Sequence, residues 1–192
     1  MKRAVLLLTA IFALAFAVNA QGLAVGSAVA DFSLPDLNGN TQPLSRLKGR
    51  SGTVVVFLSA QCPVVKAYKD RINQIAGEAH AKGINFVGIN ANANESPASL
   101  RSNAAAFGYR FPVLIDRGNQ LADRLDARTA PVVYFLNGDN VLLYQGAIDN
   151  DYTGRSITEN YLASALTASL TGQPIATTSA PPFGCTIRRG GN

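Results

Sequence analysis

The chain is poor in the residues that build metal centres and disulfide scaffolds: it has two cysteines, one histidine and no tryptophan among 192 residues. Two cysteines are too few for a disulfide-dense scaffold, but they suffice for one bridge, or for a reactive thiol and its resolving partner. The single histidine, His80, lies eighteen residues after Cys62 and has no cysteine pair beside it. We therefore expect no metal site, no other cofactor, and no hydrolase triad.

The surplus of basic residues is mild: 17 lysines and arginines stand against 12 acids, a formal net charge of +5. The basic residues are scattered, and Arg188 and Arg189 stand alone near the C-terminus. A nucleic-acid-binding surface needs a concentrated basic patch. The composition therefore predicts a mixed solvated surface and no nucleic-acid partner.

The first twenty residues have the pattern of a secretory signal peptide. Lys2 and Arg3 precede an apolar run over 4–18, and small residues permit cleavage after Ala20. The alternative is an uncleaved anchor, but the run is short for a membrane span, which needs about 20 residues. We expect a periplasmic or extracellular protein that meets the membrane only during export. That compartment is oxidising, so a disulfide would persist there.

The rest of the chain alternates strand and helix patterns, and we expect one domain over 21–172 followed by a tail over 173–192. Hairpin strands flank the turn Asn38-Gly39. Buried strands are expected at 53–58 and 84–89, and further strands at 111–115, 131–136 and 140–147, the last in a hairpin. Helices are expected at 63–82, 96–106, 118–126 and 156–171. Strand–helix–strand units imply parallel pairing, and the hairpin implies an antiparallel edge. The predicted fold class is α/β, a mixed sheet with helices on both faces. The tail is rich in Pro, Gly, Ser and Thr and is expected to be extended.

Cys62 stands where a buried strand ends and a helix begins, in the stretch LSAQCPVVK. Free backbone N–H groups and the positive end of the helix dipole favour a thiolate at such a position. Pro63 suits the first helical position, and Lys66 adds a positive charge one turn later. These features favour a reactive thiol. The alternative is a small buried apolar residue, since cysteine is among the most buried residue types.

Other residues that follow strands are weaker candidates. Asn90, Asn92 and Asn94 come after the strand over 84–89, at an edge where open α/β sheets bind ligands; the alternative is ordinary loop residues. Pro131 begins a strand after Thr129 and Ala130, and the sequence leaves its peptide bond cis or trans. The acidic run at 149–151 is either a charged lip or the approach to a helix.

FLSAQCPVVK resembles the active-site segment of thioredoxins, with Phe57 five residues before the cysteine and a lysine after it. Thr129-Ala130-Pro131 is similar to their cis-proline segment. The ordered set CPVVKAYKDR, FVGINANAN, GAIDNDY and FGCTIRR, with the opening DFSLPDLNGN, resembles the redoxin group, the alkyl hydroperoxide reductase and thiol-specific antioxidant family, in its branch with a single active-site cysteine. The resemblance spans roughly residues 28–189. It implies a thioredoxin-like fold and thiol chemistry.

Several positions depart from those families. Val65 replaces the second cysteine of a Cys-x-x-Cys pair, and Val56 replaces the buried aspartate of thioredoxins. A peroxiredoxin site would want a threonine where Ser59 stands and a proline where Val55 stands. It would also need an arginine near the peroxide, for which Arg128 is the candidate. Neither parent mechanism therefore transfers intact.

Cys185 is the only internal partner for Cys62, 123 residues away in the tail. A bridge would be structural or a redox pair in which Cys185 resolves a mixed disulfide or a sulfenic acid on Cys62. The alternative is a free tail cysteine.

The leading hypothesis is an exported thiol–disulfide oxidoreductase. Cys62 is its nucleophile, Pro63, Lys66 and Ser59 support it, and Pro131 presents backbone to an extended substrate. The expected partners are protein thiols or disulfides, or small peroxides, together with a thiol reductant. Two alternatives stay open: a thiol peroxidase with antioxidant activity, and a non-catalytic binding module of the same fold.

Overall fold

The structure is a computed structural model and describes residues 23–190. The expected signal peptide, residues 1–20, lies outside the described residues. Within residues 23–190, no helix combines the length and the apolar character needed to cross a bilayer.

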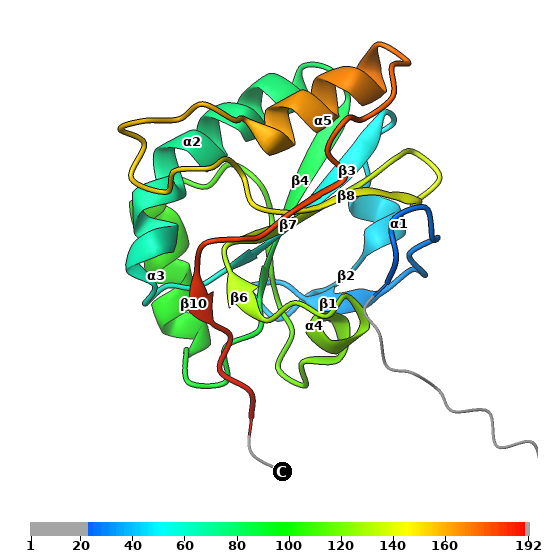
Figure 1. Ribbon diagram of the computed structural model, residues 1–192. Coiled ribbons are helices and arrows are strands. Elements are labelled where there is room, and N and C mark those ends of the chain that lie inside the picture. Colours follow the sequence, from blue (N-terminus) through cyan, green and yellow to red (C-terminus); the bar gives the residue numbers. More distant parts are fainter. Residues whose placement is uncertain (1–22, 191–192) are drawn as a thin grey trace, which may run out of the picture.

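A six-stranded sheet forms the centre of the molecule (Figure 1). Its strand order is β5 (Val113–Ile115), β4 (Ile84–Asn90), β3 (Gly52–Leu58), β7 (Val132–Leu136), β8 (Leu142–Gly146) and β9 (Ser179–Ala180). Strands β3, β4 and β5 run parallel, whereas β7 is antiparallel to β3 and β8 is antiparallel to β7. The expected mixed sheet with an antiparallel hairpin is confirmed.

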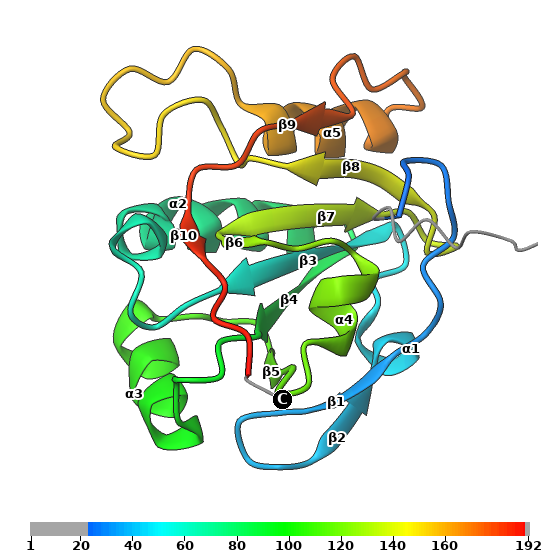
Figure 2. The same ribbon diagram turned by 60° about the horizontal axis from the view of Figure 1, so that its bottom comes forward.

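Helices cover both faces of this sheet. The helices are α1 (Leu44–Leu47), α2 (Pro63–His80), α3 (Pro97–Phe107), α4 (Gln120–Arg124) and α5 (Tyr161–Leu170). Helices α2 and α5 lie on one face, while α4 and the hairpin of β1 (Ser33–Pro35) and β2 (Thr41–Pro43) lie on the other (Figures 1 and 2). All seven residues of β3 are buried, as the continuous apolar run predicted. A strand covered on both faces has no solvated side to carry polar residues.

Local sequence signals explain two element boundaries. Gly39 has φ +89° at the hairpin turn, a conformation that glycine adopts without steric cost. Asp36 completes that turn by accepting hydrogen bonds from the backbone N–H groups of Asn38 (2.8 Å) and Asn40 (2.9 Å). Ser96 caps α3 by accepting from the N–H of Ser99 at 3.1 Å, as expected for a serine before Pro97.

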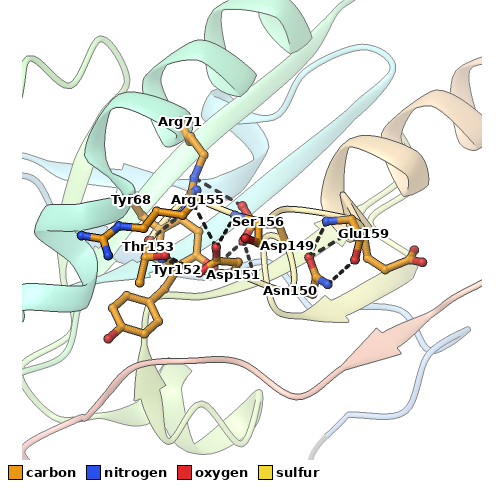
Figure 3. A network of polar contacts seen from close by, with 11 residues as sticks. Tyr68, Arg71, Asp149, Asn150, Asp151, Tyr152, Thr153, Arg155, Ser156 and Glu159 are labelled. Carbon is orange, nitrogen blue, oxygen red and sulfur yellow. Dashed lines mark hydrogen bonds and ion pairs between the residues drawn. The ribbon is translucent and has the colours of Figure 1, made fainter.

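Helix α5 begins five residues later than predicted, because polar side chains hold the preceding loop (Figure 3). The Asn150 side-chain oxygen accepts from the N–H groups of Thr158 (3.0 Å) and Glu159 (3.1 Å). The Asp151 carboxylate accepts from the N–H of Ser156 at 2.7 Å and from others in the same loop. The Thr153 hydroxyl also donates to Asp151 at 2.7 Å, and this bond, with the backbone bonds to the same carboxylate, lowers the pKa of Asp151 to about 2. The acidic run at 149–151 was expected to be either a charged lip or the approach to a helix. These contacts fit the approach to a helix.

The same loop is fastened to the Cys62 helix. Asp149 is 2% exposed and accepts a hydrogen bond from the Tyr68 hydroxyl at 2.8 Å, and Arg71 Nε lies 3.3 Å from its other oxygen (Figure 3). Burial raises the pKa of Tyr68, and the hydrogen bond to Asp149 raises it further. Arg71 also donates to the carbonyl of Tyr152 at 2.8 Å. The contacts join α2 to the loop that follows β8.

The C-terminal segment is part of the fold, where composition alone predicted an extended tail. Strand β9 pairs in parallel with β8, and β10 (Cys185–Thr186) pairs antiparallel with β6 (Thr129–Ala130) (Figure 2). Gly146, with φ +128°, lets the backbone of Ala180 approach so closely that a Cβ would overlap its carbonyl oxygen. The segment therefore crosses the carboxyl ends of β3 and β4 and passes the start of α2 at β10 (Figure 2). It ends beside the residues that follow β4 and β5, where the N–H of Arg188 donates to Asn92 and that of Gly190 to Asn119.

Candidate active site

Cys62 is the N-cap residue of α2 and lies four residues after Leu58, the last residue of β3. Its backbone is extended (φ −81°, ψ 119°), and its carbonyl accepts the hydrogen bond from Lys66 N–H at 3.1 Å. Pro63 occupies the first helical position, where the N–H it lacks would have no partner in the helix. The side chain of Lys66 is exposed on the first turn. This is the strand–cysteine–helix arrangement that the sequence predicted.

Cys62 and Cys185 are joined by a disulfide, with their Cα atoms 5.9 Å apart. Cys62 is 3% exposed, while Cys185 is half-buried. Of the alternatives the sequence left open for Cys185, the bridge is the one found. The bond closes a separation of 123 residues.

The bridge lies against the strand that precedes Pro131. The Ala130–Pro131 peptide bond is cis. Cys185 is directly opposite Ala130 in the β10–β6 pairing, and the carbonyl oxygen of Ala130 is 3.3 Å from Cys62 Sγ. The disulfide therefore lies where the start of α2, the segment before Pro131 and the C-terminal segment come together.

Glu95 organises the turn between β3 and Cys62. Its carboxylate accepts hydrogen bonds from the Ser59 hydroxyl (2.5 Å) and from the N–H groups of Ala60 (2.9 Å) and Gln61 (3.2 Å). The side-chain amide of Asn90 donates to it at 2.6 Å. Glu95 is 2% exposed, and these four donors compensate its burial.

Sequence reasoning missed Glu95, although a signal was present. It is the only acid in the asparagine-rich stretch that follows β4, at the edge where Cys62 also lies. A lone carboxylate at the carboxyl end of a buried strand is a candidate hydrogen-bond acceptor for nearby backbone N–H groups.

The asparagines after β4 partly confirm the expectation that they share the face of Cys62. Asn92 Oδ1 accepts from the N–H of Arg188 at 2.9 Å, and Asn94 donates to the Gln61 side chain at 3.1 Å. A cavity of about 640 Å³ lies here. It is lined by Ser59, Gln61, Cys62, Asn92, Asn94, Glu95, Cys185, Thr186, Arg188 and Arg189.

The structure does not bring Arg128 into this cavity. Its side chain is 74% exposed and pairs with Asp126 at 2.7 Å, and it lines a different cavity of about 540 Å³. Its backbone, however, belongs to the site, because its carbonyl accepts the N–H of Ile187 at 2.9 Å. Within residues 23–190, no cluster of three metal-ligating side chains is found.

Comparison with known proteins agrees with this geometry. A model of the AhpC/TSA family matches residues 25–145. The thiol-disulfide oxidoreductase ResA of Halalkalibacterium halodurans is 26% identical over 125 residues, which cover 64% of this chain and 69% of the relative. ResA of Bacillus subtilis is 30% identical over 118 residues, covering 61% and 64%. A solved structure of a hypothetical protein from Sinorhizobium meliloti superposes with a TM-score of 0.81 at 29% identity, covering 90% of this chain and 98% of that one.

Proposed function

The chain belongs to the AhpC/TSA family, and we propose that it is an exported thiol–disulfide oxidoreductase whose redox pair is Cys62 and Cys185. The observation that carries the proposal is the bond between a helix-N-terminal cysteine and a cysteine beside a cis-proline segment. The ResA relatives bear the name of this activity.

The local chemistry favours Cys62 as the nucleophile of the reduced form. The N–H groups of the first turn of α2 point toward it, and the helix dipole favours a negative charge there. Both stabilise the thiolate over the thiol and lower a cysteine pKa. Lys66 adds a positive charge on the same turn. Glu95 and Ser59 act as positioning residues, because they fix the turn that leads into Cys62.

In the reducing direction, the Cys62 thiolate attacks a substrate disulfide. A Cys62–substrate mixed disulfide forms, and one substrate sulfur leaves as a thiolate. The Cys185 thiolate then attacks Cys62 Sγ, forms the Cys62–Cys185 bond and releases the second substrate thiolate. Two electrons pass from the cysteine pair to the substrate. The reverse sequence oxidises a substrate dithiol, and an external thiol or disulfide restores the starting form.

The proposal includes export. The basic start, the apolar run over 4–18 and the small residues before Gln21 support a signal peptide of residues 1–20. An oxidising compartment suits a resting disulfide. Terminal sequencing of the protein from a cell envelope or culture medium is expected to give Gln21 as the first residue, and an intact Met1 there would contradict cleavage.

Thiol–disulfide exchange with a defined substrate tests the activity. The oxidised mature protein is mixed with a dithiol peptide, and both the loss of the Cys62–Cys185 bond and the gain of the peptide disulfide are followed by mass spectrometry. We expect equal molar changes, abolished in Cys62→Ser and Cys185→Ser. Exchange that survives Cys62→Ser would refute the assignment, and absence of any exchange in the wild type would favour the binding-module alternative. Peroxide consumption dependent on Cys62 would instead support the peroxidase alternative.

A further inference from the structure

We propose that the tail strand over residues 183–187, FGCTI, occupies the site where the substrate binds and resembles the substrate in sequence. Substrates would then present an extended segment with glycine directly before the reactive cysteine and a branched aliphatic residue two positions after it. This inference rests on the proposed function and defines its substrate class. The partner segment takes the tail's place on β6 when the tail is released.

The tail binds as one strand of a two-stranded antiparallel sheet. Cys185 faces Ala130 and Thr186 faces Thr129, and the N–H of Ile187 donates to the carbonyl of Arg128 at 2.9 Å. Backbone pairing of this kind holds any extended chain, and pockets for alternate side chains then select among sequences. The selection therefore lies in what residues 184 and 187 contact.

Gly184 is required by a close approach of two backbones. A Cβ at this position would lie 2.6 Å from the carbonyl oxygen of Ala130, 2.8 Å from its carbonyl carbon and 3.2 Å from its nitrogen. These are main-chain atoms of a residue that is 1% exposed, so they have no room to move aside. A residue with a side chain directly before the cysteine is therefore disfavoured, because the docked backbones would have to move apart; this is the steric specificity rule.

Ile187 supplies the apolar contact on the far side of the cysteine. Ile187 is 3% exposed and belongs to the hydrophobic core, whereas Thr186, between Cys185 and Ile187, is exposed. Successive strand residues point to opposite sides, so Cys185 and Ile187 face inward together. An incoming segment that lacks an aliphatic side chain at this position would leave an apolar hollow unfilled.

Phe183 adds a weaker preference for an aromatic residue. Its ring centroid lies 6.1 Å from that of Tyr152, and both residues are about two-fifths exposed. Tyr152 is on the loop whose backbone Arg71 holds to α2 (Figure 3). The partner class is thus an extended segment of the form aromatic–Gly–Cys–any–Ile or Val.

Synthetic peptides test the proposed resemblance between tail and substrate directly. The full-length mature Cys185→Ser protein carries Cys62 as a mixed disulfide with a small aromatic thiol, and release of that thiol reports exchange with each peptide. The probes are the peptide of residues 181–189, PPFGCTIRR, and its versions with Gly184→Ala, Ile187→Ala or Thr186→Ala. Rates are divided by those with the same aromatic disulfide free in solution, which removes differences in intrinsic thiol reactivity.

We expect the Gly184→Ala and Ile187→Ala peptides to react about tenfold more slowly than the parent peptide, because overpacking and lost burial each remove binding energy of that order. The Thr186→Ala peptide should stay within about twofold, since surface substitutions change little. Equal rates for all peptides would overturn the proposed resemblance and leave the oxidoreductase activity standing. Failure of every thiol to exchange with Cys62 would refute the proposed function itself.

A matched pair of variants tests the same contacts inside the intact chain. Gly184→Ala should lower the equilibrium constant of the Cys62–Cys185 bond against glutathione about tenfold, a shift of about 30 mV toward a more oxidising potential. Gly190→Ala is the control, because a Cβ there would meet only the Ala93 Cβ at 3.8 Å. Identical potentials for the two variants would contradict the steric rule.

Discussion

Breaking the Cys62–Cys185 bond should strongly destabilise the folded protein. The bond joins residues 123 positions apart, and cross-linking so long a loop restricts the unfolded chain. The chain-entropy relation for a loop of that length gives roughly 4.9 kcal/mol at 25 °C. For a protein of this size each kcal/mol shifts the melting temperature by roughly 2–4 °C, so the expected loss is about 10–20 °C.

Urea unfolding of the oxidised and reduced mature protein measures this difference. The Cys185→Ser variant provides the matched comparison, because it lacks the bond in either redox state. We expect it to unfold with the reduced wild type and to be insensitive to reductant. The slope with urea should also increase on reduction, since the unlinked unfolded chain exposes more surface.

Coincident unfolding curves for the oxidised and reduced wild type would contradict the predicted stabilisation by the Cys62–Cys185 bond. So would a Cys185→Ser variant that unfolds with the oxidised protein. Either result would mean that the tail docks without constraining the unfolded chain, and the bond would lose its assigned contribution to stability.

Three further outcomes are expected. Glu95→Ala should lower the free energy of unfolding in urea by about 1–3 kcal/mol and slow alkylation of Cys62 in the reduced protein, because the turn before Cys62 loses its hydrogen-bond acceptor. Glu95→Gln should restore part of the stability and part of the alkylation rate. An unchanged alkylation rate in Glu95→Ala would contradict the positioning role. Burial raises the pKa values of Tyr68, Tyr109, Tyr134 and Tyr144, so these phenols ionise first in the unfolded chain. The stability they contribute is present in full well below pH 10 and should fall above it, by roughly 5 kcal/mol per pH unit once all four are ionised in the unfolded chain; urea midpoints that stay constant from pH 9.5 to 11 would argue against this. Peroxide should oxidise reduced Cys62 much more slowly than a substrate disulfide does, measured in stopped-flow competition, because the exposed arginine candidate lies outside the cavity; faster oxidation by peroxide would favour the peroxidase.

The elements that sequence predicted well are those whose signals are local. The Asn38-Gly39 turn, the apolar run of β3 and the Ser96 cap each act through neighbours within a few residues. The predicted ends of elements were less accurate where a side chain hydrogen-bonds backbone N–H groups and holds them in a loop instead of a helix. The expected helix over 156–171 starts at Tyr161, because Asn150 and Asp151 hold the preceding loop.

The tail was the largest difference between expectation and structure. Its composition resembles an extended linker, and no periodicity marks the two short strands within it. Pairing with β8 and β6 is a long-range property, set by the close backbone approaches at Gly146 and Gly184. Cys185 is the only other cysteine in the sequence, so it was the only candidate partner of Cys62. Its distance from Cys62 could not be predicted without this pairing.

The supporting residues divide in the same way. Pro63 and Ser59 were identified because they lie beside Cys62 in sequence, and the contacts around them agree with that placement. Arg128 was chosen for its charge, but only its backbone contacts the site: its carbonyl accepts the N–H of Ile187, while its guanidinium is exposed and pairs with Asp126. Glu95 was missed because its partners lie more than thirty residues away along the chain, with the exception of Asn90.

The redox state and reactivity of Cys62 in the folded mature protein test the proposed function more directly than any other measurement. Trypsin cleavage after Arg50, Lys66, Arg155 and Arg188 places the two cysteines in fragments 51–66 and 156–188. Across a series of glutathione buffers, we predict a linked pair of fragments that separates reversibly at one potential. After reduction, Cys62 should be alkylated at neutral pH without unfolding. Two free thiols in the unreduced protein, or a Cys62 that reacts only in denaturant, would contradict the assignment of Cys62 and Cys185 as a redox pair.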